Sequence, residues 1–156
     1  MPTVYIETSI VSYLTARPNR DVVTLARQEL TREWWETRRH RHDLFTSEVV
    51  IGEAGEGDDE AAQRRLDALQ GLEELDATSQ AEDLATALLE EGPLPQKAAV
   101  DALHIAISAI EEIEYLLTWN CTHIANAAMR KPIEDVCRTR GVEAPIMCTP
   151  EELMED

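Results

Sequence analysis

Hydrophobic and polar positions alternate along this chain in blocks that switch between a strand-like and a helix-like period. Short apolar runs, typical of buried strands, are separated by stretches in which apolar residues recur every three or four positions, typical of amphipathic helices. Strands are predicted at Thr3–Ile6, Leu44–Thr46, Leu72–Asp76, Tyr115–Thr118 and Ile146–Cys148. This alternation predicts a three-layer α/β/α fold with a short-stranded, mostly parallel central sheet.

Local signals mark where several of the intervening helices begin and end. Ser79 and Glu82 have the spacing of a capping box, and Pro132 suits the first turn of the last long helix. Helices are predicted at Thr8–Leu14, from Asp21 to about His40, at Ser47–Ala54, from Asp58 to Gly71, from Ser79 to Gly92, from Pro95 to about Ile113, and around Pro132 up to Gly141. No repeat, low-complexity tract or linker interrupts the pattern, so a single domain is predicted over residues 1–156.

Composition and charge narrow the class of protein. The formal net charge of −17 disfavours a large nucleic-acid-binding surface, but it is compatible with a small metal-centred nuclease site and with a basic partner. No signal peptide is recognisable, and no apolar run approaches the roughly 18 residues of a membrane span, so a soluble, cytoplasmic protein without membrane contact is predicted. The three cysteines show no CxxC pair and are expected to be buried and reduced.

Polar residues follow two of the predicted strands directly. Glu7 comes after the first strand and Asn120 after the strand at Tyr115–Thr118, so both project at the same edge of a parallel sheet. Glu53 lies on the helix after the second strand, about two turns beyond its cap Ser47. Taken singly, Glu7 could be a helix-start acid, Glu53 part of a solvated acidic face, and Asn120 a turn residue.

Asp101 lies in the segment "AAVDALHIAISAI", which is apolar nearly all round and must therefore be largely buried as a helix. An ionised carboxylate there is costly unless it is paired or bound to a cation. The alternative is an Asp near the helix start that the helix dipole favours. His104 and His123 are interpreted as hydrogen-bonded structural histidines rather than as metal ligands.

Three carboxylates and an amide at one sheet edge would make a pocket of oxygen ligands. Such a pocket suits a hard cation such as Mg²⁺ or Mn²⁺, which can activate a water for attack on a phosphodiester. Neither a glycine-rich phosphate loop nor a nucleophile elbow follows any predicted strand, which disfavours a nucleotide-binding protein or a serine hydrolase.

The order of these motifs resembles that of the PIN domain family, which includes VapC-type toxin ribonucleases of toxin–antitoxin systems. The family has a strand ending in Asp, then Ser-x₅-Glu, then Asp at the start of an apolar helix, then a strand ending Leu-Thr-x-Asp. In this chain "YIETSIVSYL", "SEVVIGE", "DALHIA" and "YLLTWNCTHIAN" stand in those places, and they supply Glu7, Glu53, Asp101 and Asn120.

The resemblance implies a Mg²⁺- or Mn²⁺-dependent endoribonuclease in which Glu7, Glu53 and Asp101 hold the metal. Asn120 would orient a water, and Thr8 and Thr118 would support these ligands through hydrogen bonds. Glu7 and Asn120 both stand where the family usually has Asp, so one cation rather than two, weaker metal binding and reduced activity are expected. The alternative is a PIN-like binding module that acts through a protein partner or RNA without cleavage.

The resemblance also implies partners. VapC-like members usually pair with a small antitoxin protein and form homodimers, so both are expected of this chain. The basic run "RRHRH" offers Arg38, Arg39 and Arg41 for contact with RNA phosphates or with acidic residues of a partner, or forms a solvated helix end.

Overall fold

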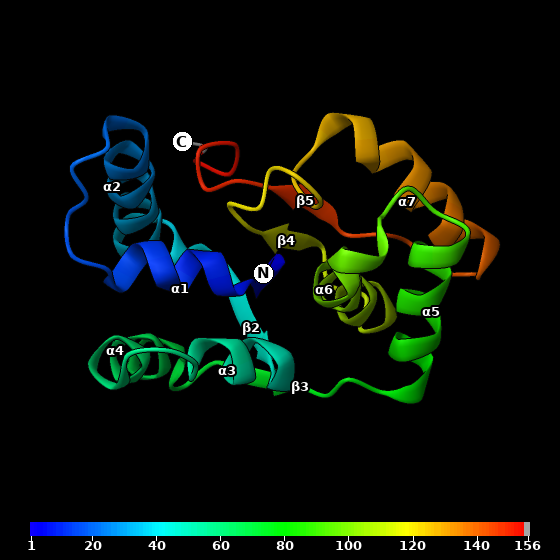
Figure 1. Cartoon of the computed structure of the whole chain (residues 1–156), viewed down its shortest axis with the longest axis horizontal. Helices are drawn as coiled ribbons and strands as arrows, with labels where there is room; N and C mark the ends of the chain where they lie inside the picture. The colour runs from blue at the N-terminus through cyan, green and yellow to red at the C-terminus, as the bar shows by residue number, and fades with distance from the viewer. Residues whose placement is uncertain (155–156) are drawn as a thin grey trace.

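Five parallel strands form the central sheet of the protein (Figure 1). The computed structural model describes residues 1–154, and the strand order across the sheet is β3-β2-β1-β4-β5. The strands are β1 (Thr3–Ile6), β2 (Asp43–Ser47), β3 (Glu73–Leu75), β4 (Tyr115–Leu117) and β5 (Ile146–Cys148). The predicted short-stranded, mostly parallel sheet is therefore confirmed, and every strand pair among the described residues is parallel.

Helices cover both faces of this sheet, as the predicted three layers require. Figure 1 shows α1, α2, α3 and α4 on one side and α5, α6 and α7 on the other. The helices are α1 (Thr8–Thr15), α2 (Val22–Thr37), α3 (Glu48–Ala54), α4 (Asp59–Leu69), α5 (Ser79–Glu90), α6 (Ala99–Ile110) and α7 (Ala127–Thr139), with short 3₁₀ turns at Arg39–Arg41 and Gln96–Ala98. No helix of residues 1–154 combines the length and the apolar character needed to cross a bilayer.

The core lies between the central strands and the two helical layers. Val4, Tyr5 and Ile6 of β1 are fully buried, because β1 has a strand on either side and helices on both faces. Helix α6 buries seven of its twelve residues, in agreement with its nearly continuous apolar sequence. The adjacent strands β1 and β4 thus lie at the centre of the molecule, and α6 packs beside them.

Two predicted helix signals differ from the structure. The cap of α5 is Thr78 rather than Ser79, because the Thr78 side chain accepts the hydrogen bond from the Ala81 backbone N–H. Pro132 lies well inside α7, since that helix begins at Ala127 behind the cap Asn126 and not at the proline.

The connections between strands cross the sheet on opposite faces. The chain passes from β1 to β2 and on to β3 through α1 to α4, and from β3 to β4 and β5 through α5 to α7. The order of the strands therefore reverses between β1 and β4. In open parallel sheets ligands bind beyond the carboxyl ends of the strands at such a point, which is where Glu7 and Thr118 lie.

Candidate metal centre

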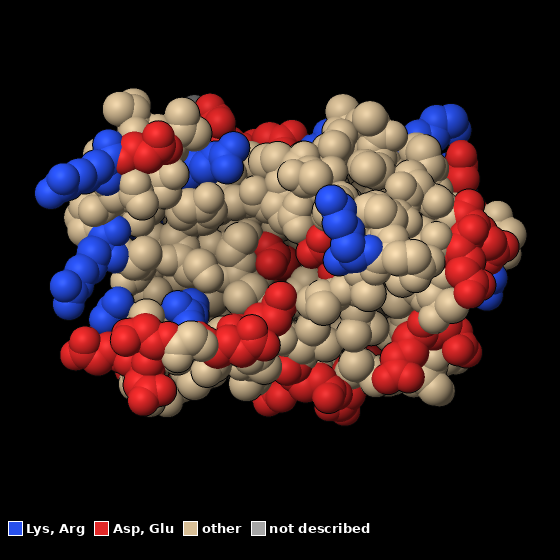
Figure 2. Space-filling model, in the orientation of Figure 1, with Lys and Arg blue, Asp and Glu red and all other residues tan. Residues whose placement is uncertain are grey.

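Acidic side chains gather beyond the carboxyl ends of β1 and β2. Figure 2 shows acidic groups in the middle of this face of the molecule, between the two helical layers. Among residues 1–154, Glu7, Glu53 and His104 offer ligand atoms that all lie within 4.8 Å of one another. The site is thus assembled from the end of β1, from α3 and from α6.

Glu7 is held at the end of β1 by two hydroxyl groups. Its backbone N–H still donates to the Leu117 carbonyl at 3.2 Å, which keeps it in line with β4. Its Oε1 atom accepts hydrogen bonds from Ser9 Oγ and Thr118 Oγ1, each at 2.5 Å. Glu7 occupies the cap position of α1, yet its side chain caps no backbone N–H. Glu7 as a whole residue is only 6% exposed. Its carboxylate therefore faces the site and does not serve as a helix cap.

Glu53 reaches the same place from the last turn of α3. Its Oε1 atom accepts a hydrogen bond from Thr8 Oγ1 at 2.6 Å and lies 2.7 Å from His104 Nε2. Burial alone would raise the pKa of Glu53, but its interactions with His104 and Thr8 outweigh that penalty and hold the pKa below its ordinary value. Glu53 is accordingly a carboxylate at neutral pH.

In both glutamates the same carboxylate oxygen, Oε2, is left without a hydrogen bond among the described residues. In each of them both hydrogen bonds go to Oε1, and Oε2 has no hydrogen-bond partner within residues 1–154. Neither glutamate forms an ion pair with a lysine or arginine in that part of the chain. Two neighbouring, part-buried carboxylates without a cationic side chain form a donor set that fits a hard divalent cation.

His104 connects this centre to the protein core. The side chain is fully buried, and its Nδ1 atom lies 2.7 Å from the Tyr5 hydroxyl. That hydroxyl also lies 2.7 Å from Ser47 Oγ. Burial raises the pKa of Tyr5 far above its ordinary value, so its hydroxyl keeps its proton. Both ring nitrogens of His104 thus have hydrogen-bonding partners, as the sequence interpretation expected, and its role towards a metal stays a prediction.

Asp101 and Asn120 belong to an adjoining group. Asp101 Oδ2 lies 2.8 Å from His123 Nδ1, and the Asn120 side-chain oxygen accepts the His123 backbone N–H at 3.0 Å. The Asn120 backbone N–H donates in turn to Thr118 Oγ1, the hydroxyl that binds Glu7. Asp101 lies in the first turn of α6, one turn before His104, and is partly exposed. The two groups are therefore neighbours, but Asp101 is outside the cluster of Glu7, Glu53 and His104.

The structure thus pairs Thr118 with Glu7 and Thr8 with Glu53 by hydrogen bonds, and the two glutamates lie close together. Sequence reasoning did not assign Ser9 or Tyr5 to this centre. The signal for Ser9 is its position two residues after the strand-end acid, where hydroxyls commonly bond to nearby groups. Tyr5 carried no such signal, because its partner His104 is 99 residues away in sequence.

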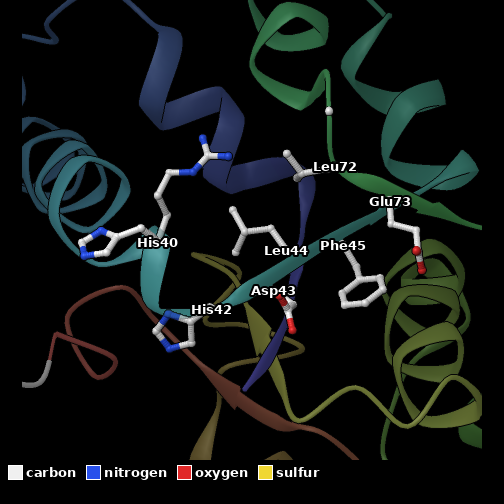
Figure 3. A pocket seen from close by; sticks show the side chains of 9 residues that line it. His40, His42, Asp43, Leu44, Phe45, Leu72 and Glu73 are labelled. Atoms are coloured by element: carbon white, nitrogen blue, oxygen red, sulfur yellow. The ribbon is translucent and has the colours of Figure 1, made fainter. Parts of the chain in front are cut away.

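The predicted basic contact residues lie elsewhere. Arg38, Arg39 and Arg41 immediately precede β2, at the amino-terminal edge of the sheet, whereas Glu7 and Glu53 lie beyond the carboxyl ends. The Arg39 guanidinium stacks on Trp35 at 4.2 Å and helps to line an open cavity of about 540 Å³. Figure 3 shows that cavity between the start of β2 and the start of β3, with His40, Asp43 and Glu73 around it. A contact through these arginines would involve a part of the RNA or partner distant from the acidic centre.

The cysteines differ in part from the expectation. All three are free thiols, and Cys137 and Cys148 are buried, as predicted. Burial raises the pKa of Cys137 to about 11 and that of Cys148 to about 12, so both stay protonated. Cys121 is exposed, which corrects the prediction that every cysteine is buried.

No protein-family model matches the sequence, and no curated protein matches it. Solved structures of similar fold do exist. The crystal structure of Mycobacterium tuberculosis VapC20, a toxin that cleaves the sarcin-ricin loop, superposes with a TM-score of 0.59 at 18% identity over 77% of this chain and 92% of that one. VapBC2 from Rickettsia felis, bound to a DNA fragment from its promoter, gives a TM-score of 0.59 at 17% identity over 94% and 98% of the two chains.

VapBC-1 from nontypeable Haemophilus influenzae gives a TM-score of 0.56 at 14% identity over 96% of this chain and 98% of that one. At these identities the comparisons establish the fold. The predicted resemblance to VapC-like PIN domains is confirmed at that level.

Proposed function

We propose that this chain, which has the fold of the VapC toxins, is a metal-dependent endoribonuclease of that kind. The observation that carries the proposal is the pair Glu7 and Glu53 at the point where the strand order reverses. Each carboxylate is held through Oε1 by two donors and leaves Oε2 uncommitted. The proposed cofactor is Mg²⁺ or Mn²⁺, because oxygen ligands suit these ions.

The side chains of the site would hold such an ion and position the substrate. A divalent cation bound by Glu7 and Glu53 supplies Lewis-acid activation of water and charge neutralisation for phosphodiester hydrolysis. Ser9 and Thr118 keep the Glu7 carboxylate at the sheet edge, and Thr8 does the same for Glu53. These hydroxyls restrict the two carboxylates to one arrangement, which lowers the cost of ordering them when a cation binds.

Asp101 and Asn120 would act from the adjoining group. Asp101 uses Oδ2 for His123, and its Oδ1 atom is proposed as the third acidic contribution to the site. The Asn120 side-chain oxygen is engaged by the His123 backbone, so its amide N–H₂ remains to orient a water or a phosphate oxygen.

A cleavage assay tests the proposal. Purified protein is incubated with a panel of structured RNAs that includes a sarcin-ricin loop hairpin, since VapC20 cleaves that loop. We expect cleavage with Mn²⁺ or Mg²⁺ and none after chelation by EDTA. Cleavage that persists in EDTA would contradict a metal-dependent site.

A small antitoxin and a second copy of the chain are the proposed protein partners. The neighbours of similar fold include a toxin–antitoxin complex from Klebsiella pneumoniae and the VapBC proteins described above. Light scattering of the purified chain tests the dimer: we expect a mass twice the 17.5 kDa of one chain. A monomeric mass at micromolar concentration would contradict it.

A binding module without nuclease activity is the second candidate. It is favoured by Asn120, which stands where the family usually has Asp and whose side-chain oxygen is used within the protein. Calorimetric titration with Mn²⁺ separates the two functions. Absence of binding at millimolar Mn²⁺ would favour the binding module, whereas binding to one site would favour the nuclease.

A further inference from the structure

His104 could take either of two roles beside the glutamates. Its Nε2 atom belongs to the set of ligand atoms within 4.8 Å of one another, so the imidazole could itself bind a cation. The same atom lies 2.7 Å from Glu53 Oε1, so it could instead donate a hydrogen bond that positions that carboxylate. One nitrogen cannot carry a proton for Glu53 and a lone pair for a metal at the same time.

The buried hydroxyls behind His104 decide between these roles. Ser47 Oγ accepts the Val50 backbone N–H at 3.2 Å as the cap of α3, and it contacts the Tyr5 hydroxyl at 2.7 Å. The Tyr5 hydroxyl contacts His104 Nδ1, also at 2.7 Å. If Ser47 donates to Tyr5 and Tyr5 donates to Nδ1, each hydroxyl proton has an acceptor.

The reverse direction would leave a proton without a partner. With a proton on Nδ1, Tyr5 would accept from His104 and donate to Ser47. The Ser47 hydroxyl proton would then have no acceptor among residues 1–154, although Ser47 is completely buried. An unsatisfied buried hydroxyl is costly, so the first direction is favoured, and it puts the imidazole proton on Nε2, facing Glu53.

We propose that His104 is a positioning residue for Glu53, held by Tyr5 and Ser47 as the neutral tautomer protonated on Nε2, and that it does not bind the cation. This inference rests on the proposed metal-dependent function and adds to it an order of metal preference. A centre built from carboxylate oxygens alone favours Mg²⁺ and Mn²⁺, whereas an imidazole ligand would favour Zn²⁺. His104, which lies close enough to the glutamates to be a ligand itself, would thus support the ligand Glu53 instead.

Nitrogen NMR of ¹⁵N-histidine-labelled protein reads the tautomer directly. In the metal-free protein we expect the His104 signals of a neutral ring protonated on Nε2, and we expect them to keep that pattern at saturating Mg²⁺. A ring protonated on Nδ1, or loss of the Nε2 proton when Mg²⁺ binds, would overturn the proposal. Tyr5→Phe assigns the signal, because removal of the phenolic proton must shift Nδ1 of His104 and of no other histidine.

Two substitutions of His104 provide a matched pair for calorimetry with Mn²⁺. His104→Gln can keep an N–H donor near Glu53 Oε1, and His104→Leu removes it. Loss of a supporting donor typically costs 10- to 100-fold in metal affinity, so we expect about that loss for His104→Leu and a change within about threefold for His104→Gln. Equal losses in the two variants would mark His104 as a ligand and overturn the proposal.

The readouts separate this inference from the proposed function. Wild-type protein that binds neither Mg²⁺ nor Mn²⁺ would overturn the proposed nuclease and, with it, the positioning role. The NMR measurement on metal-free wild-type protein needs neither a metal nor a variant that folds. It therefore reports on the direction of the hydrogen-bond chain even if His104→Leu proves unstable.

Discussion

Two groups of titratable side chains lie next to each other at the carboxyl ends of the strands, and they differ in the number of carboxylates that share one imidazole. The first places two carboxylates, Glu7 and Glu53, around a single imidazole, that of His104. The second places one carboxylate, Asp101, against one imidazole, that of His123. Thr118 and Asn120 connect the two groups through a short chain of hydrogen bonds.

The difference in burial and in neighbouring donors favours the first group as the proposed cation site. Glu7 is almost fully buried, and the hydroxyl groups of Ser9 and Thr118 that hold it carry no charge. A carboxylate in such a place is stabilised by an added positive charge. Asp101 is partly exposed, and its Oδ2 atom already lies against His123, so burial makes an added cation less necessary there. Under the proposed function the metal would therefore bind at Glu7 and Glu53, and Asp101 would have a secondary part.

The largest effect is expected from removing one charge of the first group. Glu7→Gln or Glu53→Gln should lower RNA cleavage on the order of a thousandfold, equivalent to about 4 kcal/mol in activation free energy. Cleavage rates at fixed Mn²⁺ provide the measurement. Glu60→Gln removes the same charge from an exposed position on α4 and is the matched control, with an unchanged rate expected. Wild-type rates for both site variants would exclude this centre.

A smaller loss is expected from the second group. Asp101→Asn should reduce cleavage by roughly 10- to 100-fold, because the variant keeps an oxygen but loses the charge and the pairing with His123. The same kinetic assay ranks it against Glu53→Gln. A loss as large as that of Glu53→Gln would show that the two groups form one metal site rather than two separate groups.

Glu7→Asp should weaken Mn²⁺ binding by less than tenfold. The shorter side chain withdraws the carboxylate by roughly one carbon–carbon bond, about 1.5 Å, so it cannot keep both 2.5 Å hydrogen bonds and still reach the cation. Calorimetry measures the affinity. Tighter binding than in the wild type would instead support the expectation that Glu7 is a weakened form of the Asp found in the family.

The smallest effect concerns stability as a function of pH. The pKa of Glu53 is lowered in the folded protein, so its hydrogen bonds stabilise the fold above the unfolded-state pKa and lose that effect as the pH falls through the lowered value. Urea unfolding should therefore show wild type more stable than Glu53→Gln at pH 7, with the gap narrowing towards pH 4. A gap that widens on acidification would show the opposite shift.

The sequence predicted the layers and the strand ends well, because both depend on local apolar patterns and on chain order. Glu7 could be assigned to the sheet edge from its position after Thr3–Ile6 alone. The pairing of His104 with Tyr5 and Glu53 could not be predicted from the sequence, since it depends on how α6 packs against β1 and α3. For Asp101 the sequence left two interpretations, a buried charge or an acid near the helix start. Its partly exposed position in the first turn of α6 agrees with the second, whereas its contact with His123 depends on the packing of distant segments.

A crystal structure of the protein with Mn²⁺ would locate the proposed cation, because the anomalous signal of manganese identifies the ion independently of the surrounding density. We expect one peak within about 2.0–2.6 Å of oxygen atoms of both Glu7 and Glu53, with His104 Nε2 still bonded to Glu53. A peak coordinated by Asp101 and His123 without the two glutamates, or no peak at millimolar Mn²⁺, would contradict that expectation.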